Sequence, residues 1–258
     1  TPTTQTSQEL VSDRQISDEI LVGFEVGGGW DFELSYFAQD LLIEAALMNA
    51  WFVKAEADND GGSSAITDVE TTGDTYTTAS TSPAWAEGML VLASGFTNSG
   101  NNGLKTATSG SGATTLEVAE NLTDEGSPAS TARLKAVGIQ FASGDAATDG
   151  SAKTLTCSSS STDLTDHNLR AGEWVRIGGA AAATRFGTCE NGWCRLASAP
   201  TATVMTFDIV PSGFATDAGG SKTIQLWYGD SVINDTTLVT LSIERIMEDL
   251  VSPEYEYF

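Results

Sequence analysis

Apolar and acidic side chains alternate along residues 20–34. Apolar side chains fall mostly on even positions and acidic ones on odd positions, with Leu21 as the exception. Because successive side chains of a strand point to opposite faces of a sheet, the pattern predicts one core face and one face of carboxylates. Residues 27–29 are three glycines, which predict a hairpin turn or a bulged bend. The apolar set is Ile20, Val22, Phe24, Val26, Trp30, Phe32 and Leu34, and the acidic set is Glu19, Glu25, Asp31 and Glu33.

The hydrophobic period changes after Ser35. Large apolar residues then recur at helical spacing, and alanines fill the positions between them. The pattern predicts a helix over residues 37–50, with Ser35 as its N-cap. Residues 54–83 follow with few large apolar residues and much Thr, Ser, Gly and Asp. A structureless loop of this length is unusual inside a compact domain, so we expect a linker or an extended arm. In an assembly we expect this segment to become ordered on a neighbouring subunit.

Residues 85–228 contain an internal repeat. Each copy has a Gly turn, a strand, an Asn-Gly pair and a further strand, and the Asn-Gly pairs predict hairpins. Gly103 precedes Leu116 by 13 residues, and Gly192 precedes Met205 by 13 residues. We expect a duplicated β-module with repeats at about 85–138 and 169–228. The corresponding segments are 85–91 and 169–175, 101–104 and 190–193, and 114–118 and 203–207.

Strand-like alternation returns near the end of the sequence, at residues 239–244 and again at 254–257. A strand that reaches the last residue, Phe258, predicts an edge that a partner covers or a chain that continues further. Together these patterns divide the chain into four parts. They are a first domain segment at 1–53, an extended arm at 54–83, an inserted β-rich module at 84–229, and a second segment of the first domain at 230–258.

Composition and charge narrow the classes of function. Thr, Ser and Gly make up about a third of the chain, which is typical of β-structure and loops. The formal net charge of -23 disfavours nucleic-acid binding, because affinity for phosphates comes mainly from Lys and Arg. No stretch of the sequence reaches the length of a membrane span, and residues 1–10 lack the pattern of a signal peptide.

Few residues suggest chemistry. The single histidine, His167, lies in a polar turn and is expected to be solvated at the surface, so we expect no hydrolase triad. Glu25, Asp31 and Glu33 could serve as an acid/base pair for sugar cleavage, but acidic residues at alternate strand positions are more often a solvated face. The glycines at 27–29 lack the spacing of a phosphate loop. We therefore expect no enzyme activity and no cofactor.

The three cysteines, Cys157, Cys189 and Cys194, are too few for a disulfide framework. Cys189 and Cys194 flank an Asn-Gly pair, and a two-residue turn there would place them opposite each other in a hairpin. The sequence leaves two states open for this pair, a disulfide or two free thiols. A zinc site would need two more ligands, which Cys157 and His167 supply poorly, so we expect no metal.

Several segments together resemble the tail tube proteins of long-tailed bacteriophages. They include both ends of the chain and the first repeat, about half of its length, and they are structural signatures without a catalytic fingerprint. Members of that family continue past the Ser-Ile-Glu strand with another hairpin, whereas this sequence stops at Phe258. The segments that carry the resemblance are 12–20, 31–36, 40–47, 87–88, 95–97, 101–103 and 242–245.

The resemblance implies a fold and a function. It implies a mainly β protein, with a β-sandwich or half-barrel tube domain and one flanking α-helix, into which the module of two small repeats is inserted. Six copies would form a ring, and the rings would stack on themselves into the tail tube of a virion after assembly in the host cytoplasm. Other partners would be the terminator, tape measure and distal tail proteins. DNA would pass through without adhering, and no membrane is involved.

The negative charge acquires a role in such a tube, because an acidic channel repels DNA phosphates. Glu25, Asp31 and Glu33 are the candidate channel-lining residues. The apolar face opposite them would be buried against the helix at 37–50. An alternative is a secreted carbohydrate-binding or adhesin-like β-module, which would explain the Thr, Ser, Gly and aromatic content.

Overall fold

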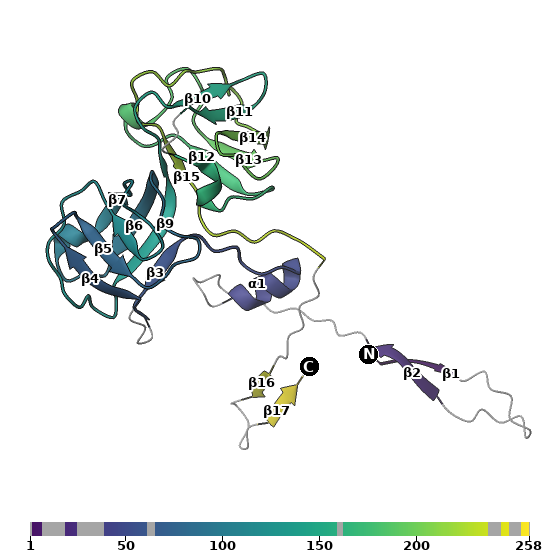
Figure 1. Cartoon of the computed structure of the whole chain (residues 1–258). Helices are drawn as coiled ribbons and strands as arrows, with labels where there is room; N and C mark the ends of the chain where they lie inside the picture. Colours follow the sequence, from purple (N-terminus) through teal and green to yellow (C-terminus); the bar gives the residue numbers. More distant parts are fainter. Residues whose placement is uncertain are drawn as a thin grey trace, which may run out of the picture. The chain divides into compact units, whose positions relative to one another are not determined.

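The computed structural model describes residues 39–60, 65–158 and 162–236 with their side chains, and four further strands by their backbone. The chain divides into two compact units (Figure 1). Unit 1 combines Thr1–Asn49 with Asn234–Phe258, and unit 2 is Ala50–Ile233. The described strands are paired in antiparallel sheets and accompany a single α-helix. The sequence-based prediction of a mainly β fold is therefore confirmed.

Unit 1 contains two separate ribbons and the helix. Strand β1 (Pro2–Thr6) pairs with β2 (Glu19–Phe24), and β16 (Glu244–Met247) pairs with β17 (Glu254–Tyr257). Helix α1 (Asp40–Leu47) lies within the predicted range but is shorter than expected. Its N-cap is Gln39, so the prediction that Ser35 caps it is wrong. Met48 ends the helix in the left-handed conformation, with φ at 52°.

Unit 2 consists of two modules with the same order of neighbouring strands, which we name module A (residues 55–141) and module B (residues 142–228). In module A the order is β4, β5, β8, β7, β6, β9, and the bridge between Ala107 and Val118 joins β8 to β7. In module B it is β10, β11, β14, β13, β12, β15. The strands of module A are β4 (Ile66–Glu70), β5 (Thr75–Thr78), β6 (Met89–Ser94), β7 (Gly103–Thr106), β8 (Thr115–Glu117) and β9 (Arg133–Gln140), with β3 (Glu56–Asp58) added beside β9. Those of module B are β10 (Ala146–Asp149), β11 (Thr154–Cys157), β12 (Trp174–Ile177), β13 (Trp193–Leu196), β14 (Val204–Ile209) and β15 (Gln225–Trp227).

The register of the strands also repeats. Tyr76 of β5 faces Leu116 of β8, and Leu155 of β11 faces Met205 of β14. Gly88 and Gly172 precede the corresponding strands β6 and β12 with φ at 82° and 85°, a conformation that favours glycine. Matching backbone hydrogen bonds hold these two turns: Gly88 N to Ala107 O, 2.9 Å, Met89 N to Ala86 O, 3.1 Å, Gly172 N to Leu196 O, 2.8 Å, and Glu173 N to Arg170 O, 3.4 Å. Unit 2 is therefore a structural duplication.

Each module has a loop held by a corresponding asparagine. Asn102 Oδ1 accepts from Phe96 N at 3.0 Å, and its Nδ2 donates to Phe96 O at 2.9 Å. Asn191 Oδ1 accepts from Phe186 N at 3.0 Å, and its Nδ2 donates to Phe186 O at 3.1 Å. The asparagine of each Asn-Gly pair thus closes a longer loop before the next strand. The prediction of tight Asn-Gly hairpins is wrong, because the asparagine side chain bonds backwards across the loop.

In each module, a carboxylate from a neighbouring segment accepts hydrogen bonds from the backbone of this loop. Glu125 Oε1 accepts from Thr97 N at 2.9 Å in module A. Asp217 Oδ2 accepts from Gly187 N at 2.9 Å, and from both the backbone N and the hydroxyl of Thr188 at 2.6 Å, in module B. Burial alone would raise the pKa of the Asp217 carboxyl, but these bonds hold that pKa well below its ordinary value.

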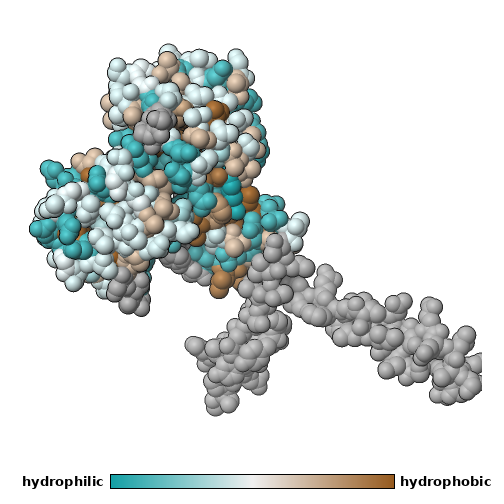
Figure 2. Space-filling model, viewed as in Figure 1, coloured by the Kyte–Doolittle hydropathy of each residue, from teal (hydrophilic) through white to brown (hydrophobic). Residues whose placement is uncertain are grey.

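The two modules share one sheet across their boundary. The last strand of module A, β9, pairs antiparallel with the last strand of module B, β15. Figure 1 shows the modules as two lobes that meet where these strands lie side by side. Each lobe has its own large buried side chains, such as Trp85 and Tyr76 in module A, and Leu155 and Met205 in module B. The visible surface of unit 2 is mostly polar or intermediate in hydropathy (Figure 2).

Residues 54–83 do not form an extended arm. They contribute β3, β4 and β5 to module A, and Ile66, Val69 and Tyr76 are buried in its core. A strand with one buried face needs apolar residues only at alternate positions, and Thr favours strands, so a segment poor in large apolar residues still forms a sheet. The predicted repeats, at about 85–138 and 169–228, are too short, because each module also contains a hairpin ahead of that range, β4–β5 or β10–β11.

Candidate functional site

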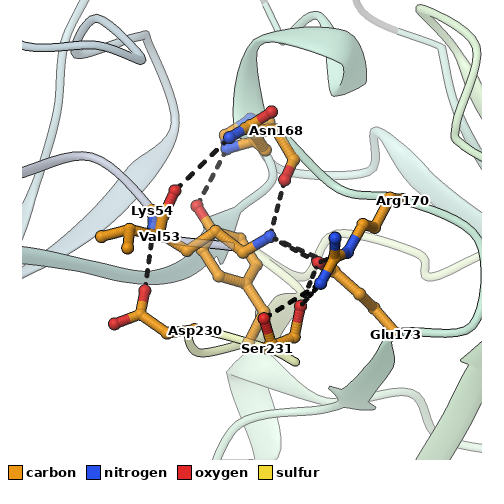
Figure 3. A network of polar contacts seen from close by, with 9 residues as sticks. Val53, Lys54, Asn168, Arg170, Glu173, Asp230 and Ser231 are labelled. Atoms are coloured by element: carbon orange, nitrogen blue, oxygen red, sulfur yellow. Dashed lines mark hydrogen bonds and ion pairs between the residues drawn. The ribbon is translucent and has the colours of Figure 1, made fainter. Parts of the chain in front are cut away.

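The chain enters and leaves unit 2 at a single place. Phe52 N donates to Ser231 O at 2.7 Å, and Ser231 N donates to Phe52 O at 3.2 Å. The two connections to unit 1 are therefore side by side, as an inserted domain requires. A polar cluster surrounds this place, and we name it the clasp (Figure 3). The clasp consists of Lys54, Asn168, Arg170, Glu173, Asp230 and Ser231.

The ammonium of Lys54 is the centre of the clasp. Lys54 is 1% exposed, and Glu173 is 2% exposed. Lys54 Nζ lies 2.9 Å and 3.0 Å from the two carboxylate oxygens of Glu173, and it donates to Asn168 O at 2.6 Å. Three acceptors thus match the three donors of the ammonium group. The bond to Asn168 and the pair with Glu173 join the incoming chain to module B.

Arg170 and Ser231 complete the surroundings of Glu173. One guanidinium nitrogen of Arg170 donates to Ser231 O at 3.0 Å, and its Nε lies 3.4 Å from Glu173 Oε1. The hydroxyl of Ser231 donates to the same oxygen of Glu173. The guanidinium also lies over the Phe52 ring, 4.3 Å from its centroid. The outgoing chain is thereby tied to the same carboxylate as the incoming chain.

Asp230 links the clasp to module A. Its Oδ1 accepts from Lys54 N at 2.8 Å, and its Oδ2 lies 2.7 Å from Lys135 Nζ on β9. Lys135 also pairs with Glu56 on β3. The clasp therefore contacts both modules as well as both connecting segments.

The local sequence explains how the Glu173 side chain comes to face Lys54. The Gly172 turn puts Glu173 directly before β12, where its backbone O accepts from Leu196 N at 2.9 Å. Its side chain meets Lys54, which lies just before β3. Burial lowers the pKa of Lys54, whereas the hydrogen bond and charge of Glu173 oppose that effect. The two buried charges, on Lys54 and Glu173, balance each other, so the buried pair is neutral overall.

This arrangement suits a structural joint better than a reaction. The Lys54 ammonium is enclosed, and its donors are already used, so it cannot reach a substrate as a nucleophile. Among the described residues, no group of three or more His, Cys, Asp and Glu side chains could hold a metal ion. The clasp fixes the point at which unit 2 is attached.

His167 is not a surface residue, and the prediction that it is solvated is wrong. It ends the short 3-10 helix η3 (Leu164–His167) and is 1% exposed. Its Nδ1 lies 3.2 Å from the hydroxyl of Tyr228, and its Nε2 has no hydrogen-bond partner among the described residues. Burial lowers the pKa of His167 to about 3, so the ring is neutral in the folded protein at neutral pH. The polar residues directly before it, Thr165 and Asp166, are exposed, so the local sequence resembles a surface turn.

The other predicted site residues have different outcomes. Glu25, Asp31 and Glu33 lie outside the described residues, so their place in a channel stays a prediction. Cys189 and Cys194 are free thiols, and both are buried. The predicted hairpin pairing of these two cysteines is wrong, because Cys189 lies in the loop before β13 and Cys194 on β13 pairs across the sheet with Val175. Burial raises the pKa of the Cys194 thiol to about 12, so this thiol is protonated at neutral pH.

No local sequence pattern points to the clasp. Its residues lie in three separated segments, and each has an ordinary polar neighbourhood. Comparisons of the chain with protein-family models, with curated proteins and with solved structures gave no match. In the part of the chain that the structure describes, no helix has the length and apolar character needed to span a membrane.

Proposed function

We propose that this protein is a structural subunit of a bacteriophage tail tube and not an enzyme. Six copies form a ring, and stacked rings form a tube through which DNA passes. The proposal rests on the resemblance described above. The observation that carries it furthest is the division of the chain, in which one unit combines both ends and the other is inserted between them. This organisation agrees with a tube domain that carries an inserted module.

The ribbons of unit 1 support an assembling protein. Within the described residues, β1 pairs only with β2, and β16 pairs only with β17. An isolated two-stranded ribbon is marginally stable in water, because its outer edges and both faces stay exposed. Additional strands from neighbouring copies would cover these edges. A closed ring of subunits removes exposed edges in this way.

The helix of unit 1 supports the same proposal. None of the residues of α1 is fully buried, although the helix is rich in apolar side chains, and Leu41 is 68% exposed. These partly exposed apolar side chains are available for packing against a neighbouring subunit. The acidic residues Glu25, Asp31 and Glu33 would then line the channel and repel DNA.

The mass of the particles in solution tests this proposal. Light scattering on the intact chain, measured from low to high concentration, is expected to give six chains or multiples of six. A matched variant replaces residues 50–233 with a short Gly-Ser linker. This is feasible because Leu47 O accepts from Asp235 N at 3.0 Å, so the two ends of unit 1 are adjacent. We expect the variant to assemble as well, whereas a strictly monomeric intact chain would contradict the proposal.

A further inference from the structure

Module B has three tryptophans on the outward face of its sheet. Trp174 and Trp193 are 46% and 56% exposed, and Trp227 is half-buried. Arg176 on β12 lies directly opposite Trp193 on one side and Trp227 on the other. Trp174 lies opposite Arg195. Since directly opposed residues share one face of a sheet, the three indoles and the two guanidinium groups form one surface, which we name the tryptophan face.

The core lies on the other side of the same strands. Val175, Cys194 and Leu226 alternate with the residues of the tryptophan face, and all three are fully buried. The orientation of the face is therefore fixed by the period of two. The indoles cannot turn inward without moving these buried side chains outward.

Planar polar groups surround the indoles. Arg195 pairs with Asp208 through two guanidinium nitrogens, with Nε at 3.0 Å and 3.1 Å from the two carboxylate oxygens. Gln225 Nε2 donates to Gln140 Oε1 at 2.8 Å, where β15 meets β9. Arg176 donates to Gly178 O at 3.0 Å. These bonds hold the polar side chains in place while leaving other donors and acceptors free for a ligand.

Module A shows that the fold does not require this surface. The cross-strand pairs Trp174–Arg195 and Arg176–Trp193 of module B correspond to Leu90–Thr106 and Leu92–Leu104 of module A. The strand order is the same in both modules, and module A forms its sheet without any tryptophan at these positions. The strand order that the two modules share therefore does not require the three tryptophans of module B.

We propose that the tryptophan face binds a neutral carbohydrate chain. The C–H face of a sugar ring stacks on an indole, and sugar hydroxyls exchange hydrogen bonds with Arg, Asp and Gln side chains. Trp193 and Trp227 are separated by two strand spacings, roughly 10 Å, so each can contact a different sugar of one chain. This proposal is independent of the tail-tube function, because it concerns unit 2 alone.

Charge favours a neutral polymer over an anionic one. Asp208 neutralises Arg195, so Arg176 provides the single unbalanced charge among the residues of the face named here. The chain as a whole carries a net charge of -23, which repels polyanions. A neutral glycan meets no such repulsion.

Affinity electrophoresis of the intact chain tests the proposal. Each native gel contains one soluble polysaccharide. The neutral ones are laminarin, mannan and dextran, and heparin is the anionic comparison. We expect at least one neutral polysaccharide to retard the chain. We expect Trp174→Ala with Trp193→Ala to weaken that affinity about tenfold or more, because the two substitutions remove the two most exposed stacking surfaces. The matched control is Leu92→Ala with Leu104→Ala, two exposed residues that face each other on the corresponding pair of strands in module A, and it should keep the affinity.

Thermal unfolding of the variants verifies that they are folded. The proposal is overturned if no neutral polysaccharide retards the chain, or if retardation persists in the folded tryptophan variant. Stronger, salt-sensitive retardation by heparin would overturn the choice of a neutral ligand. If the tryptophan variant changes only the number of chains per particle, the face binds a second copy, and the proposal is also wrong.

Discussion

Replacing Lys54 with methionine tests the clasp most severely. Methionine keeps much of the apolar stem of lysine but removes the charge and the three donors. Glu173, which is 2% exposed, then keeps its negative charge without its closest cation. Arg170 remains, but its Nε is farther away, at 3.4 Å. The variant therefore leaves a poorly compensated charge in the interior of unit 2.

The expected magnitude follows from this burial. Removing one partner of a buried ion pair costs about 3–5 kcal/mol, because the other partner stays desolvated. For a folded unit of this size, 1 kcal/mol corresponds to about 2–4 °C in Tm, so the Tm of Lys54→Met should fall by roughly 6–20 °C. Replacing Glu173 with methionine as well removes the stranded charge. The double variant should recover most of the loss.

Thermal unfolding followed by circular dichroism and tryptophan fluorescence measures these differences. The matched control is Lys153→Met, because Lys153 is exposed, and it should change the Tm little. A Lys54→Met variant with a Tm close to that of the parent would refute our interpretation of the clasp. So would a double variant that is as unstable as the sum of the two single variants, since the pair would then contribute no coupling.

Three further predictions concern a buried base, a loop and the channel. The pKa of His167 is about 3 in the folded protein, whereas a histidine in the unfolded chain is protonated below a pH of about 6.5. The unfolded state therefore binds one more proton than the folded state in this range, and stability is lost as the pH falls from 6.5 towards 3. His167→Gln should therefore reduce the loss of unfolding free energy between pH 6.5 and 4.5 by about 2–3 kcal/mol in denaturant titrations, and parallel curves would contradict this. Asp217→Asn should lower the free energy of unfolding by about 2 kcal/mol in the same titrations at pH 7, because the loop loses a charged acceptor. The control Glu70→Gln, at an exposed residue, should change the free energy of unfolding by less than about 0.5 kcal/mol. Equal effects of the two substitutions would mean that Asp217 does not hold its loop. Replacing the three candidate channel residues with lysine should create a ring of positive charge that binds DNA and slows genome delivery from well-assembled particles. Normal delivery would contradict their place in the channel. The substitutions are Glu25→Lys, Asp31→Lys and Glu33→Lys.

Local patterns predicted the fold class and the duplication but not the extent of the modules. The glycine turns at Gly88 and Gly172 and the matching spacing of the later strands are short-range signals, and the structure has both turns in the same conformation. The hairpin β4–β5 was missed because Thr-rich strands resemble loop sequence until their few apolar residues are seen to share a face. An Asn-Gly pair is typical of a tight turn, so the sequence pattern points to hairpins at Asn102 and Asn191. The hydrogen bonds that these side chains make back to Phe96 and Phe186 depend on the length of the loop, which a two-residue pattern does not report.

The clasp could not be predicted from local patterns for a different reason. Lys54 and Glu173 are far apart in sequence, and only the pairing of β9 with β15 and the return of the chain at Ser231 bring them together. A single lysine or glutamate in a sequence gives no sign that it will be buried, because charged residues are buried when partners are available. His167 illustrates the same limit, since its partner Tyr228 lies at the far end of module B.

Electron microscopy of the purified intact chain tests the proposed function most directly. End-on views should show rings with sixfold symmetry around a central channel, and side views should show the rings stacked into tubes. Unit 2 should lie on the outside as a separate density, because it is attached through one pair of adjacent segments. Single particles of the mass of one chain, at concentrations high enough to drive assembly, would contradict the proposal that this protein builds a tail tube.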